Sequence, residues 1–242
     1  MILDLDVGNT RIKWRLLGGS GGDRSGAIGT GLDLSALVPD VERVDRIRVA
    51  NVAGGAVQAA IDSWAAKRWQ LVPEYARVAA QSGGVLCGYQ NPAQLGVDRW
   101  LALLAAWQEC HHACLIVDAG SAITLDFVTN RGQHLGGYIV PGLNMMQQSL
   151  FAGTSGARVR AVTVDTSCMH LSPGQDTDAA VRNGCLAMAA GFIHNSLVSF
   201  ESDAVLFVTG GDADLLAPYT ETDTLARIRP GLVLDGLALV LG

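Results

Sequence analysis

The sequence predicts an α/β protein made of two duplicated domains, each with a mixed β-sheet flanked by helices. One pattern occurs twice: an apolar strand ends in Asp-x-Gly and an alternating strand follows, first over residues 1–17 and again over residues 114–128. Segments with helical spacing of apolar residues occur in both halves. A repeat of this size indicates two similar domains rather than a solenoid, and we place these domains at residues 1–111 and 112–242.

The first copy of the pattern opens the chain. Residues 2–7 form an apolar run interrupted by Asp4 and Asp6, which is typical of a buried strand. Over residues 11–16 basic and apolar side chains alternate, which predicts a second strand with one buried and one basic face. The turn Gly8-Asn9-Thr10 joins them, so this stretch is predicted to be a β-hairpin.

The turn of this hairpin has the chemistry of a phosphate cradle. Gly8 lets backbone N–H groups approach an anion closely, and Asp6 is suited to hold a hydrated Mg²⁺. Hydrogen-bond donors and positive charges come from Asn9, Thr10, Arg11 and Lys13. The alternative is an ordinary hairpin with a turn-forming Gly-Asn pair. The recurrence of the pattern at Asp118-Ala119-Gly120 favours the phosphate site.

Composition narrows the class of protein. The chain has 242 residues, 49% of them hydrophobic, and a net charge of −6, which argues against non-specific nucleic-acid binding. No apolar run reaches the ~18 residues of a membrane span, and we see no signal peptide. We therefore expect a cytoplasmic protein without nucleic-acid or membrane partners.

The five cysteines are scattered at positions 87, 110, 114, 168 and 185, which is typical of a reduced, cytosolic protein. The stretch Cys110-His111-His112-Ala113-Cys114 contains potential metal ligands. A zinc site usually needs a cleaner set of four ligands, so we do not predict one here.

Helices are predicted over residues 56–69, 97–110, 144–151 and 176–195, and a strand over residues 46–52. Residues 81–94 and 152–175 are predicted to be irregular. The helix at 176 begins with Asp176 or Thr177 as its N-cap. The small residues Gly184, Ala187 and Gly191 lie on one side of that helix and allow another backbone to pack closely against it. That backbone could belong to a second subunit or to the same chain.

Residues 204–212 are predicted to form a strand that runs into Gly210-Gly211. Two Asp-x-Gly hairpins, one in each half, and a late Gly-Gly turn resemble the actin-like superfamily of sugar kinases and Hsp70 ATPases, whose domains are ribonuclease H-like. This resemblance implies that the two hairpin turns grip the nucleotide phosphates from opposite sides of a cleft, and that the Gly-Gly turn approaches the adenosine.

An ordered set of short motifs narrows the resemblance to the type III pantothenate kinases. These motifs are DVGNTRIK at 6–13, GYQNP at 88–92, GVDRW at 96–100, DAGSAIT at 118–124, GGYIVPGL at 136–143, DTDAA at 176–180 and TGGD at 209–212. The resemblance implies a bacterial cytosolic homodimer that uses ATP to phosphorylate the primary hydroxyl of pantothenate to 4′-phosphopantothenate, the first step of coenzyme A biosynthesis.

The resemblance also implies a role for individual residues. Asp98 accepts the proton of the pantothenate hydroxyl, Asp6 holds Mg²⁺ through water, and Asp118 binds a monovalent cation, potassium or ammonium. The ATP-binding residues are Asp6, Val7, Gly8, Asn9, Thr10, Arg11, Ile12, Lys13 and Ser121. The pantothenate-binding residues are Tyr89, Gly96, Val97, Asp98, Arg99 and Thr177, the last in the site of the neighbouring subunit.

Elementary chemistry agrees with these roles. Phosphoryl transfer depends on positioning, charge neutralisation and a base for the acceptor hydroxyl. A carboxylate at a rigid helix start suits the base, and Arg99 can pair bidentately with a substrate carboxylate. Each residue also has an alternative role that needs no substrate site. Asp98 and Arg99 could form a charge pair on the surface at the start of a helix. Tyr89 could be an aromatic residue of a loop, and Thr177 could be a helix N-cap.

The sequence departs from the family pattern at two positions, with Ser121 where the family usually has Thr and Asp176 where it usually has Asn. Two other functions remain open. A regulatory relative that assists transcription would be expected to lose its acceptor site, whereas Asp6, Asp98, Arg99 and Asp118 are all present. Other kinases or phosphatases of the superfamily generally have longer chains.

Overall fold

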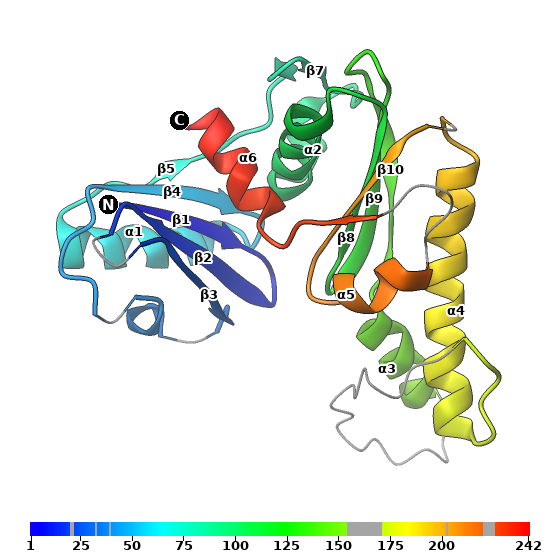
Figure 1. Cartoon of the computed structure of the whole chain (residues 1–242). Coiled ribbons are helices and arrows are strands. Elements are labelled where there is room, and N and C mark those ends of the chain that lie inside the picture. Colours follow the sequence, from blue (N-terminus) through cyan, green and yellow to red (C-terminus); the bar gives the residue numbers. More distant parts are fainter. Residues whose placement is uncertain (20–21, 32, 39, 154–170, 202, 220–225) are drawn as a thin grey trace. The chain divides into compact units, whose positions relative to one another are not determined.

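The computed structural model describes residues 1–19, 22–31, 33–38, 40–153, 171–201, 203–219 and 226–242. It divides the chain into two compact units (Figure 1). The first unit contains Met1–Glu109 and Gly231–Gly242, and the second contains Cys110–Pro230. Cys168 and most of the irregular segment predicted for residues 152–175 lie outside the described residues.

The observed units differ from the predicted domains at the C-terminal end of the chain. The sequence analysis placed residues 231–242 in the C-terminal domain, but they group with the first unit. The reason is α6, Leu232–Val240, which contacts β1 and β4 of the first sheet. A short, strongly apolar helix at the end of a chain does not reveal in its own sequence which surface it covers.

The first unit contains two further helices, two 3₁₀ turns and seven strands in its described part. The strands are β1 Ile2–Val7, β2 Arg11–Leu17, β3 Arg24–Gly29, β4 Arg46–Asn51, β5 Glu74–Tyr75, β6 Gln81–Ser82 and β7 Val85–Leu86. The helices are α1 Gly55–Trp69 and α2 Val97–Cys110, with 3₁₀ turns at Leu34–Ala36 and Pro92–Gln94.

The second unit is built from the same kinds of elements. Its strands are β8 Cys114–Ala119, β9 Ala122–Val128, β10 His134–Pro141, β11 Val205–Thr209 and β12 Arg227–Ile228. Its helices are α3 Leu143–Gly153, α4 Thr177–Val198 and α5 Ala213–Leu216, with a 3₁₀ turn at Ala217–Tyr219.

The two units share one sheet topology. The strand order is β3-β2-β1-β4-β5 in the first sheet and β10-β9-β8-β11-β12 in the second. In each sheet the first three strands along the chain pair antiparallel and the last two join in parallel. This equivalence confirms the duplicated, mixed-sheet α/β fold predicted from the repeated pattern.

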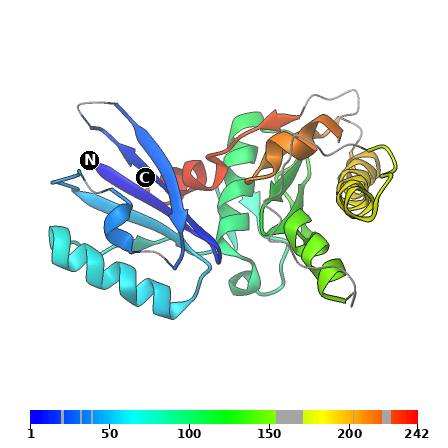
Figure 2. The same ribbon diagram turned by 90° about the horizontal axis from the view of Figure 1, so that it is seen from below.

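The first sheet has one apolar and one charged face. Leu3, Leu5 and Ile12 pack with Ile61 and Ala65 of α1 in a buried hydrophobic core. The opposite face lies toward α6 (Figure 2), since Arg15 Nη2 on β2 donates to Leu234 O at 2.7 Å. Because side chains alternate along a strand, the carboxylates at positions 4 and 6 both point to this charged face.

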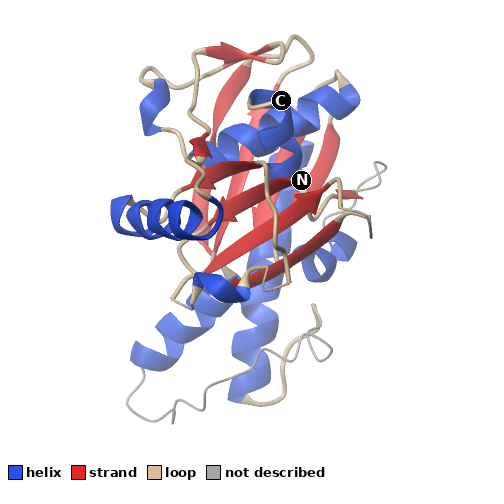
Figure 3. Cartoon of the chain, turned by 90° about the vertical axis from the view of Figure 1, so that its left-hand side faces the viewer, coloured by secondary structure: helices blue, strands red, loops and turns tan. Residues whose placement is uncertain are grey.

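In the second unit, α4 covers the apolar face of the sheet. Leu186 and Ile193 of α4 pack against Leu115, Val117 and Val208 in one core. Helix α3 lies beside α4 (Figure 3). None of the described helices is long and apolar enough to cross a membrane.

Local predictions held where they rested on helical spacing. Helix α2 has the predicted bounds, α4 begins after Asp176 as N-cap, and α1 begins one residue earlier than predicted. Residues 81–94 differ from the prediction, because they contain the β6–β7 hairpin. Gly83 and Gly84 adopt positive φ angles of 53° and 85° in its turn, a conformation that glycine adopts without steric cost.

Candidate active site

The turn between β1 and β2 is braced by hydrogen bonds. Gly8 N–H donates to Arg11 O at 3.0 Å, which closes the hairpin. Thr30, directly after β3, donates from its hydroxyl to Gly8 O at 2.8 Å and from its N–H to Thr10 O at 3.1 Å. The turn backbone is therefore fixed from two sides, as an anion cradle requires.

The side chains of this turn fall into two groups. Asn9, Thr10 and Arg11 are exposed and offer an amide, a hydroxyl and a guanidinium to solvent. Val7 and Ile12 are fully buried in the core, so they can contribute to an ATP site only through their main chain.

Asp6 and Lys13 are register partners on β1 and β2, and both are half-buried. Since directly opposite residues on antiparallel strands share a face, a carboxylate and an ammonium group stand together at the base of the turn. Mg²⁺ commonly binds through one or two carboxylates together with substrate phosphates and water. A single carboxylate beside a cationic turn fits that mode of binding.

The equivalent turn in the second unit is packed more tightly. Gly120 N–H donates to Ala122 O at 3.0 Å, and Gly142 N–H donates to Ser121 O at 3.1 Å. A Cβ on Gly142 would lie 2.2 Å from Gly120 O. Glycine at 142 thus lets the end of β10 lie directly on the Gly120-Ser121 turn, leaving the Ser121 side chain exposed.

The Gly210 turn closes on the same place from β11. Gly210 has φ +97°, and a Cβ there would lie 2.2 Å from Ala119 O and 2.5 Å from Asp118 Oδ1. Asp212 N–H donates to Ala119 O at 2.9 Å. Gly142 and Gly210 therefore both pack against the turn over residues 118–121.

A buried hydroxyl at this point fits a cation. Thr209 is the register partner of Asp118, and its Oγ1 is buried with no hydrogen-bond partner. Hard cations take oxygen ligands of this type. Within the described residues no group of three or more His, Cys, Asp or Glu side chains could hold a metal ion, so a cation here would need hydroxyl, main-chain, water or substrate oxygens as further ligands.

The structure brings Tyr89 and Arg99 together in the first unit. Arg99 Nη1 donates to Tyr89 Oη at 3.1 Å, and the guanidinium lies 5.8 Å from the centroid of the Tyr89 ring. Arg99 is only 7% exposed. A planar guanidinium beside an aromatic ring suits a carboxylate ligand.

Asp98 lies in the first turn of α2, where the helix dipole favours negative charge. Its Oδ1 accepts from Arg99 N–H at 2.8 Å. A Cβ on Gly96 would lie 2.5 Å from the same Oδ1, so glycine at 96 leaves space for the carboxylate. Gly96 and Val97 thus act through backbone shape at the start of a rigid helix.

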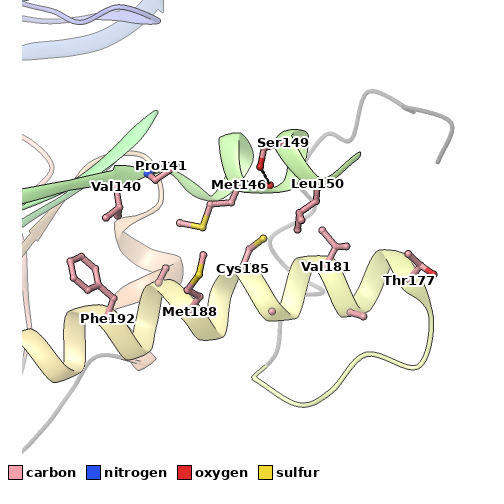
Figure 4. Close-up of a pocket in the computed structure, with 13 residues that line it drawn as sticks. Val140, Pro141, Met146, Ser149, Leu150, Thr177, Val181, Cys185, Met188 and Phe192 are labelled. Atoms are coloured by element: carbon pink, nitrogen blue, oxygen red, sulfur yellow. Dashed lines mark hydrogen bonds between the residues drawn. The ribbon is translucent and has the colours of Figure 1, made fainter. Parts of the chain in front are cut away.

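Thr177 lies elsewhere, at the exposed start of α4. Asp176 is the N-cap, because its Oδ1 accepts from Ala179 N–H at 2.7 Å. Thr177 borders an apolar cavity of about 920 Å³ between α3 and α4 (Figure 4). Met188 and Leu150 line it and are 59% and 50% exposed. The described residues that line this cavity include none of the charged groups that phosphate chemistry needs.

Sequence reasoning missed two buried pairs of polar side chains. Asp4 pairs with Arg48, and His134 Nε2 lies 3.0 Å from Asp126 Oδ1. Thr209 was also missed as a separate feature. Asp4 and Asp126 could have been flagged as carboxylates within apolar strands, but their partners come from other strands.

Comparison with known proteins agrees with this geometry. The family described as type III pantothenate kinase matches residues 2–198. A type III pantothenate kinase of Pseudomonas paraeruginosa is 39% identical over 250 residues, covering 99% of this chain and 98% of the relative.

Solved structures at lower identity share the fold. A protein described as a Baf family transcriptional activator from Campylobacter jejuni has a TM-score of 0.62 at 21% identity, covering 99% of this chain and 96% of the other. The activator of 2-hydroxyisocaproyl-CoA dehydratase from Clostridium difficile, with bound ADPNP, has a TM-score of 0.55 at 12% identity, covering 99% and 92%.

Two units of equivalent strand order, each with a braced Asp-x-Gly turn, define the class of actin-like ATPases and sugar kinases. The sequence comparison is more specific than the fold, because the type III pantothenate kinase of Pseudomonas paraeruginosa is 39% identical to this chain, whereas the two solved structures are 21% and 12% identical. Within this class the chain belongs to the type III pantothenate kinase family.

Proposed function

We propose that this protein is an ATP-dependent kinase that phosphorylates the primary hydroxyl of pantothenate to 4′-phosphopantothenate, the first step of coenzyme A biosynthesis. The observation that carries the proposal is the family match over residues 2–198, with type III pantothenate kinases aligned along 99% of the chain. The braced turns and the Tyr89–Arg99 pair support it independently.

Asp98 is the proposed base. In phosphoryl transfer the pantothenate hydroxyl oxygen attacks the γ-phosphorus of ATP, ADP leaves, and the hydroxyl proton passes to a carboxylate. Asp98 has a fixed position at the start of α2, with one oxygen held by Arg99 N–H. Its other oxygen is the proposed proton acceptor.

Arg99 is the proposed partner of the pantothenate carboxylate. Its guanidinium is oriented by Tyr89, so little side-chain entropy remains to be lost on binding. Tyr89, Gly96 and Val97 shape the same site.

The two turns are the proposed ATP phosphate sites, at residues 6–13 and at Ser121. Asp6 would hold Mg²⁺ through water, and Asp118 with Thr209 would hold potassium or ammonium. These ions would neutralise charge on the transferring phosphoryl group.

A homodimer is part of the proposal. The α3–α4 groove is apolar, and Met188 and Leu150 on its rim are exposed to a degree that is unusual for large apolar side chains on a monomer. A second copy of the chain would cover it. Gly184 lines the groove and a Cβ there would meet open space, which favours the interface use of this bare helix side over packing within the chain. Thr177, at the end of the groove, would then reach the neighbouring subunit's site.

The proposed enzyme is cytoplasmic, where ATP is available and where the four described cysteines would stay reduced. The net charge of −6 gives no support for a nucleic-acid partner. The regulatory alternative draws only on a structural likeness at 21% identity, which shows the fold alone.

The test is a coupled ADP-release assay with purified protein, ATP, Mg²⁺ and potassium or ammonium, with and without pantothenate. We expect ADP release that depends on pantothenate, with 4′-phosphopantothenate as product by mass spectrometry. ADP release independent of pantothenate would point to another acceptor, and no turnover in either salt by a folded protein would revive the regulatory alternative.

A further inference from the structure

Two cysteines that the proposed kinase chemistry does not use lie at the start of the second unit. Cys110 is the last residue of α2 and Cys114 is the first residue of β8. Between them His111 adopts a left-handed φ of 46°, which reverses the chain from helix to strand. This reversal brings the two thiols within range of each other, so that each affects the ionisation of the other.

The two thiols have different surroundings. Cys110 is half-buried and reachable from solvent, whereas Cys114 is fully buried. In its protonated form Cys110 Sγ donates to His112 O at 3.4 Å. Arg227 on β12 supplies positive charge near Cys110. An accessible sulfur with nearby positive charge is the usual setting of a reactive cysteine.

These surroundings separate the two pKa values. The neighbouring Cys114 thiol and the positive charge of Arg227 lower the pKa of Cys110 to about 6. The neighbouring Cys110 thiol and burial raise the pKa of Cys114. Near neutral pH Cys110 is therefore the nucleophile, and Cys114 keeps its proton.

We propose that Cys110 and Cys114 form a reversible thiol–disulfide site, oxidised by hydrogen peroxide and reduced by a small-molecule dithiol. The Cys110 thiolate attacks one peroxide oxygen, the O–O bond breaks and hydroxide leaves, so that Cys110 becomes a sulfenic acid. The Cys114 sulfur then displaces the hydroxyl group from Cys110, whose oxygen leaves as water with the Cys114 proton. The hydroxide takes a proton from solvent, so one peroxide gives two waters and two thiols give one disulfide.

The contact between the thiols decides the product. A sulfenic acid with a neighbouring thiol condenses to a disulfide, whereas one without such a thiol proceeds to sulfinic acid. The disulfide would join the end of α2 to the first residue of β8, the strand that carries Asp118.

The sequence allows a clean test. Trypsin cleaves after Arg99 and Arg131, so one peptide, residues 100–131, contains both cysteines and no other. The purified full-length protein is treated with hydrogen peroxide, unfolded in iodoacetamide, digested and analysed by mass spectrometry. We expect this peptide to lose about 2 Da and to take up no alkyl group. Dithiothreitol should restore two alkylation sites.

Three variants sharpen the test. Cys110→Ser should give no disulfide. In Cys114→Ser, dimedone labelling of Cys110 after peroxide should rise at least about tenfold over wild type, because the sulfenic acid is no longer resolved. Cys87→Ser, which changes a half-buried cysteine of the first unit, should oxidise like wild type. The proposal is overturned if wild-type Cys110 goes to sulfinic acid without a disulfide, or if both thiols remain alkylatable after peroxide.

Discussion

Arg48 donates two hydrogen bonds to Asp4 inside the first unit, from Nε to Oδ1 at 2.7 Å and from Nη2 to Oδ2 at 3.1 Å. Arg48 is 3% exposed and Asp4 0%. Asp4 also accepts from Arg15 Nη2 at 3.1 Å, and Arg15 pairs in turn with Asp235 of α6. This chain of charges fastens the C-terminal helix to the strand that carries Asp6.

Replacing Asp4 tests the importance of that network. Asp4→Asn leaves Arg48 as a buried cation without its compensating charge, so we expect a loss of about 3–5 kcal/mol in the free energy of unfolding. Urea unfolding followed by circular dichroism measures it. Asp40→Asn, which breaks an exposed pair with Arg24, should change stability far less. Equal small losses in both variants would show that the buried pair is not needed.

Gly236→Ala tests how α6 packs on α2. A Cβ at position 236 would lie 2.2 Å from Leu101 O, and backbone cannot move away as a side chain can. We expect a loss of about 1–3 kcal/mol by the same measurement. Gly55→Ala in α1 is the matched control, because a Cβ on this helical glycine meets open space. A stable Gly236→Ala variant would mean that the two helices can separate at little cost.

Asp98→Asn separates catalysis from nucleotide binding. The amide keeps the shape of the side chain but is a poor proton acceptor, so we expect kcat to fall about 10²–10⁴-fold, with ATP affinity by calorimetry unchanged. Asp40→Asn should retain wild-type turnover. A near wild-type rate in Asp98→Asn would rule out Asp98 as the base.

Exchange of potassium for sodium tests Asp118. The fit of a cation to fixed oxygen ligands depends on its size and dehydration cost, so we expect turnover to fall sharply in sodium at equal ionic strength. Asp118→Asn should flatten the dependence on potassium concentration. Equal wild-type rates in the two salts would remove the proposed cation role.

Mixing two inactive variants tests the shared site of the proposed homodimer. If Thr177 acts in the neighbouring subunit, a mixed dimer of Asp98→Asn and Thr177→Val contains one intact site. Random exchange should therefore restore about one quarter of wild-type activity. Each variant alone should have low turnover, measured by pantothenate-dependent ADP release.

The α3–α4 groove provides the control for this mixing experiment. Met188→Asp places a charge on the apolar rim, so we expect it to yield monomers by light scattering and to abolish the restored activity. Val72→Asp changes an apolar residue that is 87% exposed outside the groove and should leave the dimer intact. No restored activity from a mixture of verified dimers would place Thr177 outside the neighbour's site.

The sequence by itself determined the duplicated fold, four of the six described helices and the family. These properties depend on residues that are close together in the sequence. The spacing of apolar residues distinguishes helix from strand, and Asp176 caps α4. The repeated Asp-x-Gly turn marks equivalent positions in both halves. The candidate residues at 6–13 could be named from the chemistry of their turn, whereas those at 96–99 were named from the resemblance of their motif to the family.

Only the tertiary structure decided which distant groups meet. It placed α6 on the first sheet rather than in the second unit, paired Asp4 with Arg48, and set Gly142 and Gly210 against the turn beside Asp118. It also buried Val7 and Ile12 and oriented Arg99 with Tyr89. Such pairings depend on how strands and helices from distant parts of the chain pack together. The spacing of residues within one segment does not identify which distant residue a side chain will contact.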